Sequence, residues 1–223
     1  MSIHLQRDLE SLQIQLLAQS SVVEEMIRKA CRAIHAIRPV LAAEIMDHEQ
    51  LVNEREVRIE EDCLKILALH QPVAVDLRRT ATIMKINNDM ERIADLAVNI
   101  AERAQGLTLY PEFMVPETFD RMAQLAVTMV QDALNALVRL DVDAAREVCL
   151  RDDDVDALNR EVINEMRGIM RTRPELIEAA LNLFSASRHI ERIADHATNI
   201  AEDVIYLVDG EIARHKHDLH SVA

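Results

Sequence analysis

Aromatic residues are almost absent from this chain. Of its 223 residues only 2% are aromatic, with no tryptophan, three phenylalanines and two tyrosines. Glycine (3) and proline (5) are also scarce, although a β-rich protein needs such residues for its many turns. Hydrophobic residues still make up 49% of the chain, so a core of Leu, Ile, Val, Ala and Met is available. We therefore predict an all-α protein built by helix-on-helix packing.

Positive charge is the second shortage. The chain has 39 acidic and 25 basic residues, which gives a formal net charge of −14. Binding to nucleic acid depends on Lys and Arg side chains that neutralise phosphates, so this balance argues against it. It argues equally against direct binding to anionic membrane surfaces. We expect no nucleic-acid partner, and contact with a membrane only through partner proteins.

Long apolar runs and paired cysteines are missing too. No stretch approaches the roughly 18 apolar residues of a transmembrane helix, and the N-terminal segment MSIHLQRDLESLQIQ has no apolar signal core. Cys31, Cys63 and Cys149 are scattered and odd in number. This usage is typical of buried thiols in a reducing compartment. The predicted location is the cytoplasm.

What the sequence does contain is an internal repeat. Residues 91–102 read ERIADLAVNIAE and residues 191–202 read ERIADHATNIAE, so ten of twelve positions are identical. The residues just before each block, 84–90 and 184–190, match at no position. Because identity is confined to the block, the block is under a constraint that its neighbours do not share. The chain is predicted to contain two copies of one structural unit.

Prolines and an aspartate divide each half into three segments. The prolines are Pro39, Pro72, Pro111, Pro116 and Pro174. A further break is expected at Asp141–Asp143, where an aspartate can cap a helix. The predicted helices cover residues 5–37, 40–69, 73–105, 117–140, 143–171 and 175–208, the last one ended by Gly210. We predict two tandem three-helix bundles of up-down-up topology, residues 1–108 and 109–223, the second with a short polar tail.

Each copy of the block forms an amphipathic helix with an acidic stripe. On a helical wheel the apolar residues gather on one side, and the oxygen-bearing residues fall within about 80° on the other. The oxygen-bearing residues are Glu91, Asp95, Asn99 and Glu102 in the first copy and Glu191, Asp195, Asn199 and Glu202 in the second. A solvated surface is the ordinary explanation. Against it, the acids are identical in both copies, although like charges at i,i+4 destabilise a helix and asparagine is a poor helix former.

The helix before each block carries a second oxygen-rich pair. Glu49 and Asn53 in the first half correspond to Asp152 and Asp156 in the second. The second and third helices of a three-helix bundle are neighbours, so the two stripes can converge on one face. Carboxylates and amides without cysteine make a hard-oxygen site that suits Mg²⁺, Ca²⁺, Mn²⁺ or iron. A bound cation would also relieve the repulsion within each stripe.

Other catalytic and metal motifs are missing. The chain has no Glu-x-x-His, no HExxH, no P-loop and no GxGxxG. A metal-dependent hydrolase using the stripes is an alternative, but no base or nucleophile of another type accompanies the carboxylates. Metal storage is a second alternative, which the absence of Glu-x-x-His weakens. His196 could approach a metal or lie on the surface, and His215, His217 and His220 in the tail could bind metal adventitiously.

In these motifs the chain resembles the PhoU family, accessory and regulatory proteins of bacterial phosphate uptake. The resemblance covers residues 5–210 and rests on the doubled ERIAD-x-A-x-NIAE block, on QPVAVDLR at 71–78 and on DDDVDALN at 152–159. It implies two similar three-helix bundles whose acidic motifs hold clusters of metal ions in some members. In this chain those motifs fall on Glu91/Asp95, Glu191/Asp195 and Asp152/Asp156.

The resemblance implies a regulator rather than an enzyme, and therefore no catalytic residues. PhoU-like proteins link the phosphate ABC transporter, through its ATPase, to a sensor histidine kinase. They keep the phosphate-starvation response off and restrain uptake when phosphate is plentiful, and they commonly form homodimers or larger homo-oligomers. A metal cluster, with iron, manganese, zinc or magnesium as candidate ions, would serve as an assembly or docking surface.

The chain departs from the family pattern in its two halves. Ala94 and Ala194 stand where the family block commonly has glycine, and alanine is still small enough for close packing. Asn53 leaves the first half one carboxylate short, so we expect it to bind metal more weakly than the second. Asp76 is expected in the first turns of the third helix, where a carboxylate favours the helix dipole. Its counterpart in the second half is leucine, so the halves are not expected to be functionally equivalent.

Overall fold

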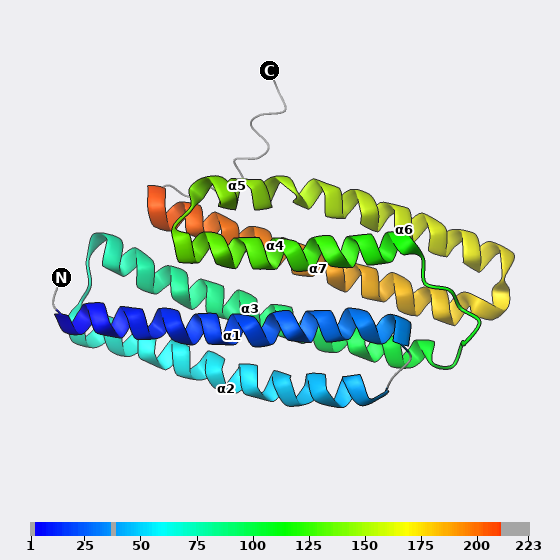
Figure 1. Cartoon of the computed structure of the whole chain (residues 1–223), viewed down its shortest axis with the longest axis horizontal. Coiled ribbons are helices and arrows are strands. Elements are labelled where there is room, and N and C mark those ends of the chain that lie inside the picture. Colours follow the sequence, from blue (N-terminus) through cyan, green and yellow to red (C-terminus); the bar gives the residue numbers. More distant parts are fainter. Residues whose placement is uncertain (1–2, 37–38, 211–223) are drawn as a thin grey trace, which may run out of the picture.

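The chain folds into a set of long helices. The computed structural model describes residues 3–36 and 39–210, and every regular element within them is a helix. In chain order these are α1 (Ile3–Ala36), α2 (Pro39–His70), α3 (Ala74–Leu107), α4 (Glu117–Arg139), α5 (Val142–Leu150), α6 (Asp152–Thr172), the 3₁₀ turn η1 (Pro174–Leu176) and α7 (Ile177–Asp209) (Figure 1). In this described part of the chain, no helix combines the length and the hydropathy needed to span a bilayer.

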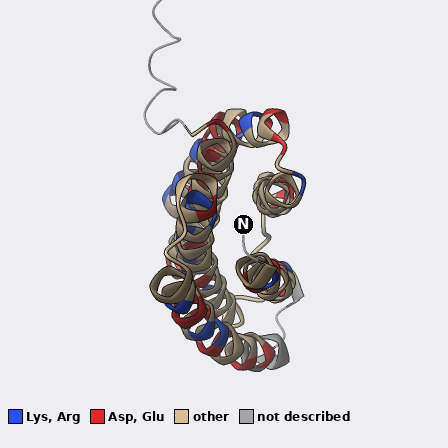
Figure 2. Cartoon of the chain, turned by 90° about the vertical axis from the view of Figure 1, so that its left-hand side faces the viewer, with Lys and Arg blue, Asp and Glu red and all other residues tan. Residues whose placement is uncertain are grey.

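The helices form two three-helix bundles, which confirms the predicted fold. Helices α1, α2 and α3 make the first bundle, and α4, the α5–α6 pair and α7 make the second, which lies above the first in Figures 1 and 2. The bundles pack on each other mainly through α3 and α7, and less closely through α1 and α4. Lys85 pairs with Asp203, whereas Gly106 lies against Asn182. The earlier residue of α3 thus contacts the later residue of α7 and the reverse, so these two helices are antiparallel.

A single apolar core runs through both bundles and is almost entirely aliphatic. Its fully buried side chains are mainly Leu, Ile, Met, Val and Ala, and Phe119 is the largest of them. Ala94 and Ala194 of the repeated block are both fully buried. Both small side chains therefore lie in the packed interior of the bundles.

One predicted helix proves to be two. The sequence predicted a continuous helix over residues 143–171, but α5 ends at Leu150 and α6 begins at Asp152, with Arg151 at the joint. Three consecutive aspartates, 152–154, form the first turn of α6. Inside a helix these charges would repel each other, whereas in a first turn they complement the positive end of the helix dipole. Arg151 Nη1 also donates to Asp132 Oδ2 of α4 at 2.5 Å, which ties the joint to the neighbouring helix.

The predicted helix ends agree with the structure in most places. The Asp141 side chain accepts a hydrogen bond from Ala144 N at 3.0 Å and caps α5. Gly210 ends α7 with φ +74°, a conformation that glycine adopts without strain. The third helix begins at Ala74 rather than at residue 73, and it carries Asp76 in its first turn as expected. The tail histidines, His215, His217 and His220, lie outside the described residues.

Candidate functional site

Helices α6 and α7 bring four carboxylates into one cluster at the surface of the second bundle. Asp152 and Asp156 come from α6, and Glu191 and Asp195 come from α7. The pKa of Asp195 rises to about 6, chiefly through burial and then through the negative charges of Asp152, Glu191 and Asp156. Burial and the charge of Asp156 likewise raise the pKa of Asp152. The expected convergence of the two helices is therefore seen; we call these four residues the second acidic cluster.

Helices α2 and α3 form a corresponding first acidic cluster, with one member that sequence reasoning missed. Glu49, Glu91 and Asp95 were expected. Burial raises the pKa of Glu91, followed by the charge of Asp95 and by smaller contributions from Glu56 and Glu49. Glu56 lies seven residues after Glu49, hence on the same face of α2, and this spacing could have revealed it. With Glu56 the first cluster also has four carboxylates, although Asn53 still stands where the second half has Asp156, so the weaker metal binding expected of the first half stays a prediction.

The asparagines of the stripes are placed less uniformly. Asn99 and Asn199 are half-buried on the block helices, and Asn53 is exposed on α2 between Glu49 and Glu56. An amide oxygen at each site can add to the carboxylate oxygens as a ligand to a hard cation. The three asparagines could serve as accessory donors, beside carboxylates that carry the charge.

The last acid of the second stripe does not face solvent as predicted. Glu202 is 9% exposed, and its charge is the second cause, after burial, that raises the pKa of Cys149 of α5 to about 12. The equivalent Glu102 in the first copy is exposed. The difference follows from the short helix α5, which packs against α7 in the second bundle. Glu202 is thus part of the packing between α5 and α7, not of the acidic cluster.

The clusters have the donor chemistry of an oxygen-ligand metal site, but their side chains are not closed around a common point. Within residues 3–36 and 39–210, no group of three or more His, Cys, Asp or Glu side chains is arranged to hold a metal ion. Arginines take up part of the charge instead. Arg188 Nη1 lies 2.5 Å from Glu191, and Arg160 Nη1 lies 3.8 Å from Asp156, while Arg92 plays the same part in the first cluster. Cation binding requires the carboxylates to turn away from these arginines.

Replacing Asp195 with asparagine should stabilise the protein at neutral pH. Its folded-state pKa of about 6 lies above the ordinary 3.8, so the folded state disfavours the charge and loses stability as pH rises from 4 through 6. Because the Asp195 side chain is also partly open to solvent, where salt screens its charge, we expect a gain below about 1 kcal/mol at pH 7.5, shrinking towards zero at pH 4. Thermal denaturation in chelator measures it. Asp47→Asn, an exposed position on α2, is the control and should show no gain; an unchanged or lower melting temperature for Asp195→Asn at pH 7.5 contradicts the argument.

His196 lies between the two bundles, so the expectation of a surface position was wrong. Its Nδ1–H donates to Asp89 Oδ1 of α3 at 2.8 Å, and the two side chains are 18% and 12% exposed. The first copy of the block has Leu96 at this position. The counterpart of Asp89 is His189, whose pKa is lowered chiefly by burial and then by neighbouring arginines. The pair therefore occurs once, and it breaks the symmetry of the interface between α3 and α7.

These features define a class of protein: a duplicated three-helix bundle with an acidic cluster at the surface of each half. The sequence model of the PhoU domain matches this chain twice, over residues 16–104 and over residues 119–204. The chain belongs to the PhoU family.

Individual relatives agree over nearly the whole chain. A Pseudomonas aeruginosa protein is 37% identical over 211 residues, which cover 93% of this chain and 86% of that protein. An Aquifex aeolicus protein is 37% identical over 211 residues, or 95% of this chain and 96% of that protein. Both are named phosphate-specific transport system accessory protein PhoU homolog.

Solved structures show the same fold. The crystal structure of PhoU from Pseudomonas aeruginosa matches with a TM-score of 0.87 and 37% identity, covering 92% of this chain and 99% of that one. That of the phosphate transport system regulatory protein PhoU from Streptococcus pneumoniae matches with a TM-score of 0.87 and 27% identity, covering 94% and 99%. The similarity therefore includes both bundles.

Proposed function

We propose that this protein is a cytoplasmic regulator of phosphate uptake that acts through protein contacts and not as an enzyme. It restrains the phosphate ABC transporter and keeps the phosphate-starvation response off when phosphate is plentiful. The observation that carries the proposal is the PhoU domain, matched in both halves of the chain. Its relatives are named accessory proteins of the phosphate-specific transport system, and this chain matches them over almost its whole length.

The partners that this function requires are the transporter ATPase and the sensor histidine kinase, with a second copy of the chain in a homodimer. The two acidic clusters are the surfaces that we assign to docking. Each presents four carboxylates whose charge is only partly balanced by arginines, which suits either basic protein surfaces or a bridging cation. Electrostatic complementarity of this kind sets partner choice and association rate.

A bound cation fits the donor set of both clusters. Iron, manganese, zinc or magnesium would be held by Asp152, Asp156, Glu191 and Asp195, with Asn199, and by Glu49, Glu56, Glu91 and Asp95, with Asn53 and Asn99. The raised pKa of Asp195, Asp152 and Glu91 supports this assignment, because it reports repulsion and burial that a positive charge would offset. A metal there would neutralise the cluster and shape it for a partner.

The cysteine thiols do not supply a nucleophile for the hydrolase alternative. Burial raises the pKa of each cysteine thiol, Cys31, Cys63 and Cys149, to about 12, so none is a ready nucleophile. The acids of the second cluster are half-buried or exposed on α6 and α7. No observation favours the hydrolase or the storage alternative over the adaptor.

Direct binding tests this proposal. The purified protein should bind the purified transporter ATPase and the cytoplasmic part of the sensor kinase in biolayer interferometry. Asp152→Ala/Asp156→Ala should weaken at least one of these contacts, while Asp47→Asn, exposed on α2, should leave both unchanged. If neither partner binds with or without Mn²⁺, the adaptor function is wrong.

A further inference from the structure

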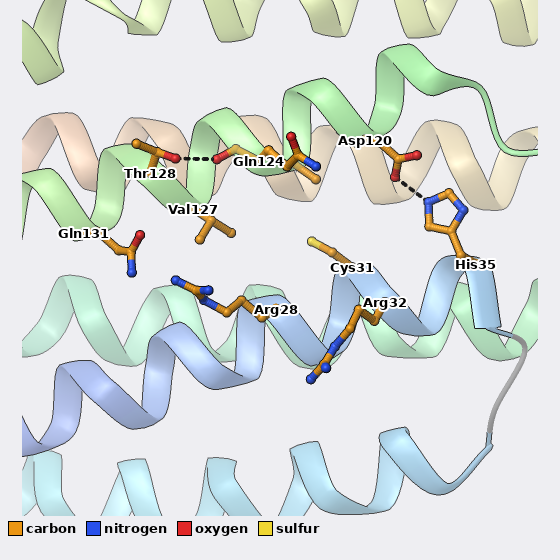
Figure 3. A pocket seen from close by; sticks show the side chains of 10 residues that line it. Arg28, Cys31, Arg32, His35, Asp120, Gln124, Val127, Thr128 and Gln131 are labelled. Carbon is orange, nitrogen blue, oxygen red and sulfur yellow. Dashed lines mark hydrogen bonds and ion pairs between the residues drawn. The ribbon is translucent and has the colours of Figure 1, made fainter.

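A groove of about 560 Å³ lies between the two bundles, where the second half of α1 faces α4 (Figure 3). Helix α1 lines it with Arg28, Cys31, Arg32 and His35, and α4 lines it with Asp120, Ala123, Gln124, Val127, Thr128 and Gln131. The acidic clusters lie on other helices, α2 with α3 and α6 with α7. The groove is therefore separate from the acidic clusters, and the proposed function does not involve it.

The acids near this groove hydrogen-bond to groups other than its arginines, so no described carboxylate lies closer than 4.0 Å to Arg28 or Arg32. Asp120 Oδ1 lies 2.5 Å from His35 Nε2, and the Glu24 carboxylate accepts a hydrogen bond from Gln131 Nε2 at 2.8 Å. Arg28 approaches Glu24 only at 4.0 Å. Arg32 has no ion pair within 4.0 Å among the described residues. The groove therefore offers two guanidinium groups whose N–H donors are open to a ligand.

The remaining lining supplies neutral donors and an apolar wall. Gln131 and Val127 point from α4 into the space that Arg28 also faces, and Cys31 points from α1 towards α4 (Figure 3). The Arg32 side chain is directed away from α4 in the same view, but it is exposed and its stem can rotate towards the groove. Burial, followed by the charge of Asp120, raises the pKa of the Cys31 thiol to about 12. The groove is thus equipped to bind a molecule and not to attack it.

We propose that this groove binds an anion that carries several linked phosphate groups, either an inorganic polyphosphate or a nucleoside polyphosphate. A guanidinium group donates two parallel hydrogen bonds to a phosphate, which makes arginine the preferred residue for such ligands. Arg28 and Arg32 are spaced i,i+4, so their Cβ atoms lie about 5–6 Å apart on one face of α1, and their long side chains can converge on neighbouring phosphates of one ligand. Grooves of several hundred Å³ are typical of small-molecule sites.

A ligand in this position contacts α1 and α4 at once, and therefore both bundles. The direct contact between the bundles is less extensive on this side than between α3 and α7. The anion should then raise the melting temperature as well as bind, because it adds contacts across the interface that exist only in the folded state. A single orthophosphate reaches one arginine at a time and should bind more weakly.

Calorimetric titration tests the proposal, with chelator present so that cations at the acidic clusters do not contribute. The probes are tripolyphosphate, ATP and orthophosphate, at about 50 mM salt, where charge-assisted contacts are weakly screened. We expect tripolyphosphate and ATP to bind in the sub-millimolar range and orthophosphate more weakly. Equal affinity for the first two identifies the phosphate chain as the recognised group; tighter binding of ATP shows that the nucleoside contributes.

The decisive variant is Arg28→Gln/Arg32→Gln, which should weaken tripolyphosphate and ATP at least tenfold. Arg28→Lys/Arg32→Lys keeps the positive charge but loses the paired N–H donors of each guanidinium group, so it should lose only part of the affinity. Arg167→Gln/Arg171→Gln, an exposed pair with the same spacing on α6, removes the same charge elsewhere and should bind as wild type. Circular dichroism confirms that each variant is folded; if the glutamine pair is not, the lysine pair decides.

Three results would overturn the proposal. The first is no detectable binding of tripolyphosphate or ATP at about 5 mM, a concentration at which a ligand with a sub-millimolar dissociation constant occupies most of its sites. The second is an equal loss in the α6 control, which would show general charge attraction. The third is binding of an acidic peptide without binding of either polyphosphate, which would make the groove a protein-docking surface. None of these outcomes bears on whether the protein binds the transporter ATPase or the kinase.

Discussion

Replacing Glu191 and Asp195 with alanine should abolish tight cation binding by the second acidic cluster. These two carboxylates are half of the charge that the cluster offers, and both belong to the block that is repeated in the chain. The remaining pair, Asp152 and Asp156, sits on α6 alone and cannot surround an ion. We expect at least a tenfold loss of affinity, because hard cations depend on the number of charged oxygen ligands.

The measurement is a titration of chelator-treated protein with Mn²⁺, Fe²⁺, Mg²⁺ and Zn²⁺. Wild type should bind at least one of them below millimolar concentration, and Glu91→Ala/Asp95→Ala should remove the sites of the first cluster in the same way. Since Asp195 has a pKa of about 6, protons should compete with the cation and affinity at the second cluster should fall below pH 6. If no cation binds below millimolar concentration, or if Glu191→Ala/Asp195→Ala binds as well as wild type, the clusters are only a solvated surface.

Replacing His196 with leucine should destabilise the interface between the bundles. The substitution copies the residue of the first repeat, Leu96, but it leaves the Asp89 carboxylate, whose side chain is 12% exposed, without the hydrogen bond from His196. A buried polar group that loses its partner costs about 1–3 kcal/mol, and each kcal/mol lowers the melting temperature by roughly 2–4 °C in a chain of this size.

A double-mutant cycle separates the pair from simple packing. Asp89→Ala/His196→Leu should lose less stability than the sum of the two single variants, because the unpartnered carboxylate is removed with the histidine. His189→Leu is the control: this ring is half-buried at the symmetry-related place, and no acid hydrogen-bonds to it among the described residues. Additive effects, or an equal loss in His189→Leu, would show that the pair contributes nothing specific.

The architecture could be predicted because its signals are local. Prolines near segment ends, helical periodicity and one repeated block each act within a few residues, and together they imply two three-helix bundles. The break at Arg151 was missed although its signal was present. Three successive aspartates are unfavourable inside a helix and favourable in a first turn, and residues 152–154 could have been interpreted in that way.

The site was predictable only where its members share a helix face. Periodicity found Glu49, Glu91 and Asp95, and the same argument extended by one heptad would have found Glu56. By contrast, Glu202 is covered by α5, and His196 faces Asp89 from the other bundle. These positions are decided by contacts between helices that lie far apart in the sequence. The groove between α1 and α4 has the same origin, since His35 and Asp120 are brought together by tertiary packing alone.

The most direct test of the proposed function is the response of the starvation genes when this protein is removed. A deletion strain carrying an alkaline phosphatase reporter should express it strongly in phosphate-rich medium, where the parent strain keeps it off. Expression of the wild-type chain should restore repression, and the variant with alanine at positions 191 and 195 should restore it less well. Unchanged reporter activity in the deletion strain would contradict the assignment of this protein as the regulator.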